Sequence, residues 1–306
     1  SNSITFAHID DQENDFPKIR VWGTIGWIAA SWAFPMIWLQ TNLQFQTMPP
    51  FIAGAEVSNV TSRLVDALKF SGGISIVYGA FCFLLPNTPP KRDATDKLAF
   101  KKAFELFQHS SFTILVISSL TVSIIHQIYF LQTGPFLSYI GVPDSQIGPA
   151  MTIGQFAEIL TMAYLGTFLK RLGFKKVITT GIAAYFLRYA IFGTEILPVW
   201  VMIMSQAFHG FCYAFFFAAA YVYVDKIAEE DVRHSAQTVF GIIILGGGPV
   251  IGGWLSGYLQ NEYTSVNRFP GPDQITFDYS IFWYTLSLIG LATATFFYFS
   301  FKEQTR

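Results

Sequence analysis

The sequence predicts an all-α protein that crosses a membrane many times, as three observations indicate. Hydrophobic residues make up 52% of the 306 residues and charged residues only 13%, whereas soluble domains carry about 25% charged residues. The apolar residues form runs of the length that a membrane helix needs, and Lys and Arg gather at alternate ends of these runs. A soluble fold of this composition would expose large apolar patches to water, so we expect a lipid-facing surface.

Eight apolar runs are long enough to span a bilayer, which takes about 20 residues in a helix. Residues 1–9 have the character of the last turns of a further helix. We therefore expect the chain to continue a bundle whose first helices lie upstream. The predicted spans cover residues 18–40, 64–85, 111–140, 147–169, 176–193, 198–224, 235–259 and 277–301.

The positions of Lys and Arg predict the orientation of the spans. Nearly all of the 19 basic residues lie at alternate boundaries between spans, and the exceptions are Arg63, Lys69, Arg188 and Arg268. Loops rich in Lys and Arg stay on the cytoplasmic side of a membrane. We therefore expect the basic boundaries and the C-terminus to be cytoplasmic.

Segment 86–110 is the longest connection on the predicted cytoplasmic side. It mixes charged and apolar residues, as a short amphipathic helix on a membrane surface does. It divides the chain into residues 1–85, with two spans, and residues 111–306, with six.

Glu158 is the most informative polar residue, because it lies in the middle of a predicted span. An ionisable group at membrane depth costs at least ~2.5–3.5 kcal/mol. Gln155 lies three residues earlier and so faces the same side of the helix. Loss of water favours the neutral form of a carboxyl group, so we expect Glu158 to bind both a proton and a substrate in a wet cavity. The alternative is a structural hydrogen bond between helices.

Other polar residues inside the spans leave both interpretations open. His126 and Gln127 are neighbours, so one of them is expected to face inward. Arg188 either pairs with a carboxylate or extends toward the membrane surface. His209 and Tyr213 share one helix face, although a lone membrane His is often only a hydrogen-bonding link between helices.

Arg20 opens the first span, with Thr24 and Trp27 on its face of the helix. Composition alone favours a basic anchor at the membrane surface, and the alternative is a cation and a ring beside a substrate cavity. The sequence contains no H-E-x-x-H metal motif and no clear nucleophile–base set, so an enzyme is not favoured and no cofactor or metal is expected. A net charge of −1 gives no electrostatic reason to bind nucleic acid.

Two motifs resemble a known family. LKRLGFKKV (169–177), between two spans, resembles the basic cytoplasmic loop of the major facilitator superfamily. DFPKIRVWGTIGW (15–27) resembles the fifth-helix signature of the nucleoside:proton symporter family within that superfamily, and GQFAEI, YFLRYAIF and DVRHSAQTVF further along resemble it in order and spacing.

This resemblance implies a major-facilitator-like helical bundle that lacks about its first four transmembrane helices. The eight spans then correspond to helices five to twelve, and residues 1–9 to the end of helix four. Residues 1–85 would belong to the N-terminal half, and residues 111–306 would form the six-helix C-terminal half. Because the pocket would lack the wall made by the first four helices, we expect the 306-residue chain not to transport by itself.

The family imports nucleosides together with protons by alternating access between two six-helix halves. The resemblance therefore implies a multi-pass protein of the bacterial inner membrane, with a nucleoside, protons and the lipid bilayer as its partners. Glu158 is the expected proton-coupling group. The residues expected to bind substrate are Arg20, Thr24, Trp27, Gln127, Gln155, Glu158, His209 and Tyr213.

The chain departs from the family pattern at several of these positions. Phe130 stands where the family has an amide, Ala214 where it has a carboxylate on helix ten, and Phe217 near a further amide. His209 replaces a phenol. Since the groups that bind ribose and base are only partly retained, another small polar solute, such as a sugar, nucleobase or organic anion, remains an alternative, as does a non-transporting receptor.

Overall fold

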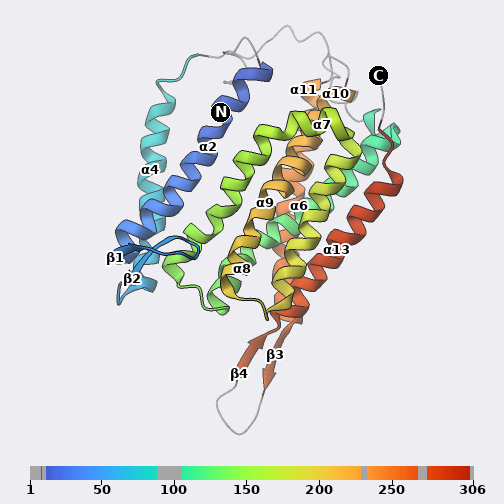
Figure 1. The fold of residues 1–306 in the computed structure, drawn as a ribbon. Coiled ribbons are helices and arrows are strands. Elements are labelled where there is room, and N and C mark those ends of the chain that lie inside the picture. The colour runs from blue at the N-terminus through green and yellow to red at the C-terminus, as the bar shows by residue number, and fades with distance from the viewer. Residues whose placement is uncertain (1–7, 9–11, 88–104, 229–232, 268–273, 304–306) are drawn as a thin grey trace. The chain divides into compact units, whose positions relative to one another are not determined.

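The structure, a computed structural model, consists almost entirely of long helices (Figure 1), which confirms the predicted fold class. It describes residues 8, 12–87, 105–228, 233–267 and 274–303. The predicted end of helix four, apart from residue 8, and most of the predicted cytoplasmic segment 86–110 lie outside these residues. The chain forms two compact units, one of Ser1–Thr95 with Pro143–Thr152 and the other of Asp96–Val142 with Ile153–Arg306.

The first unit contains two long helices joined by a hairpin that the sequence analysis did not predict. Strands β1 and β2 pair antiparallel, and the buried amide of Gln40 holds them to the start of α7. Its Nε2 donates to the Ser145 carbonyl at 2.9 Å and its Oε1 accepts from the Gly54 N–H at 2.6 Å. The elements are α2 (Gln12–Phe34), the π-helix η1 (Pro35–Leu39), β1 (Gln40–Phe45), β2 (Ile52–Glu56), α3 (Val60–Leu64) and α4 (Asp66–Cys82).

The second unit is a bundle of antiparallel helices with one short hairpin, β3–β4, between its last two helices. Two helices of this bundle contain π-helical segments, η4 and η5. The start of α7, up to Thr152, belongs to the first unit and the rest to the second. The described elements are η2 (Leu106–Gln108), α6 (Ser110–Tyr139), α7 (Asp144–Thr194), α8 (Val199–Met204), η3 (Ser205–Ala207), α9 (Phe208–Phe211), η4 (Cys212–Ala218), α10 (Ala219–Ile227), α11 (Arg233–Gly241), η5 (Ile242–Gly247), α12 (Gly248–Glu262), β3 (Thr264–Asn267), β4 (Gln274–Phe277) and α13 (Tyr279–Ser300).

Helix α7 is two helices in sequence, because Gly173 has non-helical dihedral angles, with φ +75°. Only glycine adopts this conformation without steric cost, so the residue lets the chain turn back within the motif 169–177. The two arms correspond to the predicted spans 147–169 and 176–193. Among the described residues six helices, α7 counted once, are long and apolar enough to cross a membrane. The predicted span 18–40 coincides with α2 and η1, which are not among these six.

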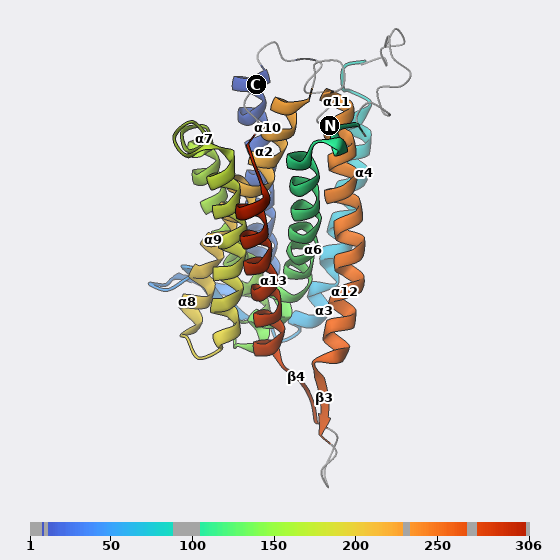
Figure 2. The same ribbon diagram turned by 90° about the vertical axis from the view of Figure 1, so that its right-hand side faces the viewer.

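Small residues let the helices of the second unit approach closely, as is usual in membranes. Helix α12 lies beside α6, and α13 packs on the same helix (Figure 2). A Cβ atom added at Gly252 would stand 2.8 Å from the Ile124 carbonyl of α6. A buried hydrogen bond of 2.9 Å from Gln132 to Ser256 also joins the two helices.

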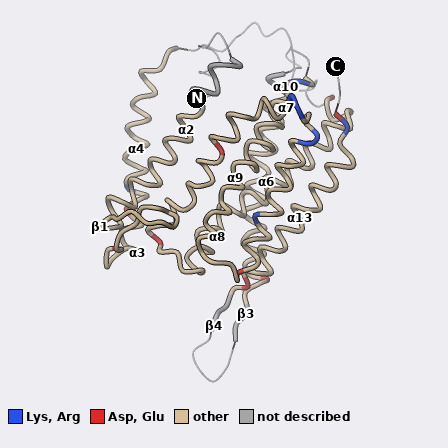
Figure 3. Tube along the Cα trace, in the orientation of Figure 1, with Lys and Arg blue, Asp and Glu red and all other residues tan. Residues whose placement is uncertain are grey.

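Aromatic side chains fill the interior of the same bundle. Trp283 of α13 is completely buried, and its ring lies 5.5 Å from Phe136, 5.5 Å from Tyr189 and 5.0 Å from Phe192. Basic residues gather instead at the end of the unit where α10 and the C-terminus lie (Figure 3). Away from this end, many large apolar side chains on the helices are exposed, as a lipid-facing surface requires.

Candidate substrate and proton site

Glu158 lies in the first arm of α7, midway between Asp144 and Leu172, and its side chain is buried. Two glycines bring α9 against this part of α7. A Cβ atom at Gly210 would stand 2.5 Å from the Ala157 carbonyl carbon and 2.7 Å from the Glu158 nitrogen, and one at Gly154 would stand 2.8 Å from the His209 Cβ. This backbone contact places the side chains of Glu158 and His209 next to each other.

His209 faces the Glu158 carboxylate. Its Nε2 lies 3.8 Å from Glu158 Oε2, and both side chains are buried. The ring of His126 from α6 stacks on His209 with centroids 5.5 Å apart. The hydroxyl of Tyr185 is 2.7 Å from His126 Nδ1. A carboxylate and two imidazoles from three helical segments therefore meet inside the bundle.

Arg188, in the second arm of α7, lies on the other side of His209 and is completely buried. Its Nη1 is 3.3 Å from His209 Nδ1, and its Nη2 donates to Gln206 Oε1. The Tyr129 hydroxyl also donates to that oxygen, at 2.9 Å, and the guanidinium lies over the Tyr129 ring, 3.6 Å from its centroid. A buried cation needs such hydrogen bonds and cation–π contacts to offset its lost hydration.

We call these six residues, all within the second unit, the polar cluster. It combines one cation and one carboxylate, with an imidazole between them, in a helical bundle that is otherwise apolar. Buried charges of opposite sign stabilise each other strongly, so adding a proton to Glu158 changes the electrostatic balance of the whole group. The polar cluster consists of Tyr129, His126, Glu158, Arg188, Gln206 and His209.

Three further predicted site residues lie in the second unit. Gln155 is buried one turn before Glu158, and its Oε1 has no hydrogen-bond partner among the described residues. The ring of Tyr213 lies 6.3 Å from His209. Gln127 is half-buried and packs against α12, where a Cβ at Gly252 would stand 2.9 Å from its Cβ. His126, rather than its neighbour Gln127, contacts the polar cluster.

The remaining predicted residues belong to the first unit. Thr24 and Trp27 lie on α2, where Thr24 is half-buried and Trp27 is 40% exposed. The side chain of Arg20 lies outside the described ones. Substrate binding by these three residues stays a prediction.

Aromatic and apolar residues occupy the positions at which the chain departs from the family pattern. The rings of Phe130 and Phe217 each lie 5.0 Å from the ring of His126, and Ala214 is completely buried. Apolar rings therefore surround the two histidines where the family pattern has amides.

Sequence reasoning missed Gln206 and Tyr129 and left Arg188 and His126 undecided. Gln206 precedes His209 by three residues, so its position on the same helix face was visible in the sequence. The partners of Arg188 could not be identified from the sequence, because they come from other helices, α6 and the segment η3–α9.

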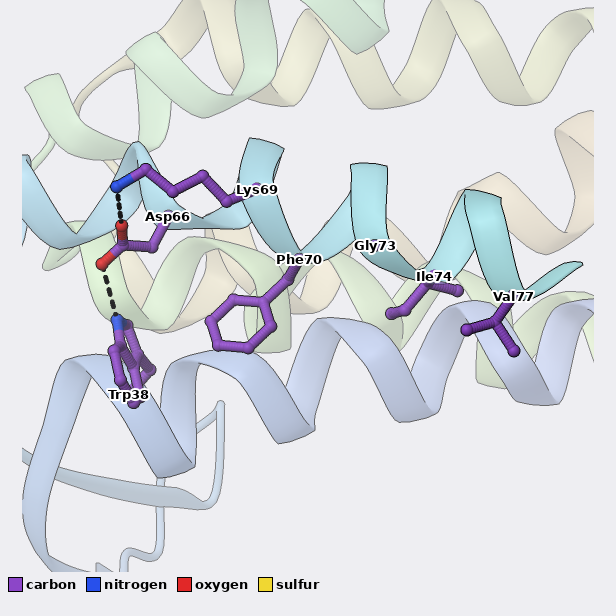
Figure 4. Close-up of a pocket in the computed structure, with 7 residues that line it drawn as sticks. All are labelled: Trp38, Asp66, Lys69, Phe70, Gly73, Ile74 and Val77. Carbon is purple, nitrogen blue, oxygen red and sulfur yellow. Dashed lines mark hydrogen bonds and ion pairs between the residues drawn. The ribbon is translucent and has the colours of Figure 1, made fainter.

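One surface hollow of about 530 Å³ lies in the first unit, along α4 (Figure 4). Its polar groups bond to one another, since Asp66 accepts from Trp38 Nε1 at 3.0 Å and from Lys69 Nζ at 2.7 Å. Ligand sites usually combine an apolar lining with polar groups left available to the ligand, so this hollow is a poor candidate. No group of three or more potential metal ligands occurs among the described residues.

Comparison with known proteins places the chain in one family. Residues 1–306 match the family model described as "Nucleoside H+ symporter". The chain is 30% identical to "Putative nucleoside transporter YegT" of Escherichia coli (strain K12), covering 99% of this chain and 68% of that protein. It is 26% identical to "Xanthosine permease" of the same organism, covering 99% of this chain and 70% of that protein.

Solved structures agree with this relationship. A crystal structure of nucleoside transporter NupG superposes with a TM-score of 0.73 at 25% identity, covering 99% of this chain and 72% of that chain. "Nucleoside permease NupG" of Escherichia coli (strain K12) is 28% identical, covering 86% of this chain and 62% of that protein. This multi-pass membrane protein belongs to the nucleoside H+ symporter family.

Proposed function

We propose that the protein imports nucleosides together with protons. The observation that carries the proposal is the buried Glu158 carboxylate, which faces His209 in the middle of a membrane helix. A carboxylate at this depth is costly unless it has a function or a partner. Membership of the nucleoside H+ symporter family supplies the substrate class and the coupling ion.

In this proposal Glu158 gains a proton from the outer side and releases it inside. Neutral Glu158 carries no charge into the closed, dehydrated state, so protonation favours the movement that exposes the site to the other side. Gln155, with an unpartnered oxygen one turn away, hydrogen-bonds a ribose hydroxyl or a base edge. Such contacts select a substrate because a solute without these groups leaves buried polar atoms unpaired.

We propose further aromatic and polar contacts to the substrate by residues of each unit. Trp27 and Tyr213 stack on or flank the base, while Arg20, Thr24, Gln127 and His209 supply polar contacts. The roles of Arg20, Thr24, Trp27 and Gln127 rest on their match to the family pattern. Those of His209 and Tyr213 rest on their shared helix face and on the contact of His209 with Glu158.

We further propose an inner bacterial membrane and a cytoplasmic C-terminus. Basic residues gather at the end of the second unit near the C-terminus (Figure 3), as the positive-inside rule requires for a cytoplasmic face. Cysteine labelling at the chain end in intact cells and in inverted vesicles tests this orientation. Labelling of intact cells from outside would contradict it.

Uptake of labelled uridine or inosine under an inward proton gradient tests the function, in a form of the protein extended by the helices expected upstream. Glu158→Gln is expected to lose accumulation against a gradient and to keep nucleoside exchange, because the amide mimics only the protonated acid. The matched control is Glu262→Gln, which neutralises an exposed carboxylate at the end of α12 and should leave uptake unchanged. Gradient-driven accumulation by Glu158→Gln would remove Glu158 from the coupling role.

The apolar side chains at Phe130, Ala214 and Phe217 favour a second candidate, transport of another small polar solute. Competition of labelled nucleoside uptake by sugars, nucleobases and organic anions separates the two. Strong competition by one of these solutes, with weak competition by nucleosides, would reassign the substrate. Binding of the solute without transport, unaffected by a proton gradient, would indicate a receptor. Uptake by the purified 306-residue chain would contradict the expectation that this chain is inactive alone.

A further inference from the structure

Arg188 contacts one of the two ring nitrogens of His209. The guanidinium of Arg188 has only N–H donors and no acceptor. Its Nη1 lies 3.3 Å from His209 Nδ1 in a hydrogen bond. The Nδ1 atom must therefore accept this bond with its lone pair, and it carries no proton.

A neutral imidazole whose Nδ1 accepts has its proton on Nε2. Nε2 is the atom that faces Glu158 Oε2, at 3.8 Å. The N–H of His209 is thus directed at the carboxylate, and a movement of less than about 1 Å would bring the two atoms to hydrogen-bond distance.

A second proton on His209 would have to sit on Nδ1. An N–H at Nδ1 would face the N–H of Arg188, donor against donor, and would place a second positive charge beside the buried guanidinium. The other titratable groups facing His209 are His126 and Tyr129 from α6 and Tyr213 one turn along its own helix, at ring distances of 5.5, 5.8 and 6.3 Å. None of these three is a carboxylate, so Glu158 is the one carboxylate of the polar cluster near His209, and the Arg188 guanidinium already offsets its charge.

We propose that Arg188 is a positioning residue that holds His209 as a neutral Nε2–H donor, so that Glu158 is the group of the polar cluster that binds the proton. This inference rests on the proposed proton coupling by Glu158. Ionised Glu158 attracts the Nε2–H of His209 as a charged acceptor. Protonation removes this charge, so the contact with His209 weakens, and the neutral carboxyl gains an O–H that can donate to a solute.

Nitrogen NMR of the ¹⁵N-histidine-labelled protein in lipid nanodiscs tests the inference without a transport assay. His209→Gln identifies the His209 signals by their loss. We expect the neutral Nε2–H pattern for His209 from pH 5 to pH 8. An Nδ1–H pattern, or an imidazolium signal in this range, would overturn the proposal.

Two substitutions of Arg188 separate positioning from packing. Arg188→Lys keeps a side chain that only donates and should keep the Nε2–H pattern. Arg188→Gln presents an amide that can also accept, so His209 should show mixed tautomers and gain a second proton at acid pH. Equal spectra in the two variants would contradict a positioning role. If either variant fails to fold, the spectrum of the unsubstituted protein still decides the tautomer.

Uptake measurements then connect the tautomer with coupling. The pH profile of nucleoside uptake should shift in Arg188→Gln and stay close to that of the unsubstituted protein in Arg188→Lys. If a form of the protein extended by the helices expected upstream shows the expected spectra but transports no nucleoside, the proposed function is refuted and the tautomer assignment stands. The reverse result, nucleoside uptake by a protein whose His209 is charged, would refute the assignment of the His209 tautomer and leave the proposed function standing.

Discussion

Gly210 is the position where the candidate site depends most directly on close helix packing. A Cβ atom there would stand 2.5 Å from the carbonyl carbon of Ala157, 2.6 Å from its oxygen and 2.7 Å from the nitrogen of Glu158. All three are backbone atoms, so no side chain can rotate away. Carbon atoms in contact normally lie about 3.5–4.0 Å apart, and Gly210→Ala must therefore move α9 and α7 apart by about 1 Å.

The free energy of this change has two opposing parts. Overpacking in a filled interior costs about 1–3 kcal/mol, while replacing glycine by alanine inside a helix gains about 0.5–1 kcal/mol. Gly166→Ala on α7 isolates the second part, because nothing lies within 4 Å of its added Cβ. The two variants should therefore differ in stability by the overpacking cost alone, about 1–3 kcal/mol.

Apparent unfolding midpoints of the two variants, measured in one detergent at one heating rate, check this difference. Gly210→Ala should unfold at a lower temperature than Gly166→Ala and should lose the pH dependence of uptake, because separation of the helices moves His209 away from Glu158. Equal midpoints for the two variants would refute the close approach of α9 to α7. A lower midpoint with unchanged uptake would show that the contact serves stability and not the site.

Three further changes test other parts of the fold. Gly173→Ala should destabilise the fold by about 1–3 kcal/mol, the cost of a backbone conformation that is essentially restricted to glycine, and so lower the unfolding midpoint; an unchanged midpoint would contradict the turn in α7. Ser256→Ala removes the hydrogen bond from Gln132 and should cost about 0.6 kcal/mol, seen in the same measurement. Burial and the Asp278 carboxylate raise the pKa of Glu195, which lies outside the spans. The folded state therefore binds the Glu195 proton more tightly than the unfolded state does. The stability of the fold should fall as the pH rises from the usual pKa of a Glu through the raised pKa. Asp278→Asn keeps the cap on Ile281 and should weaken this fall in midpoints measured from pH 4 to pH 7, and an equal fall would refute the electrostatic cause.

The membrane helices could be predicted from the sequence because hydropathy is a property of each segment by itself. Transfer of an apolar run into lipid depends on its length and composition and hardly on its neighbours. The predicted spans 111–140, 235–259 and 277–301 accordingly agree with α6, α11–α12 and α13 within a few residues. The hairpin β1–β2 was not predicted, because its pairing depends on contacts such as those of Gln40 and not on a strand pattern.

The candidate site was predictable only in part, for a related reason. The high cost of a carboxylate in the membrane marked Glu158, and helical spacing placed His209 and Tyr213 on one face. Helical spacing does not reveal how neighbouring helices are rotated against each other. The choice of His126 over Gln127 as the residue that meets the cluster required the packed bundle.

By itself the sequence predicted a chain that crosses a membrane, most of the helices long and apolar enough to do so, and a carboxylate in the middle of one of them. The tertiary structure decided the partners of that carboxylate. Arg188 could have paired with an acid or extended toward the membrane surface, and the bundle instead packs it against His209, Gln206 and Tyr129. The physical reason is steric, because Gly154 and Gly210 let α9 approach α7 closely, and this approach fixes which polar groups meet.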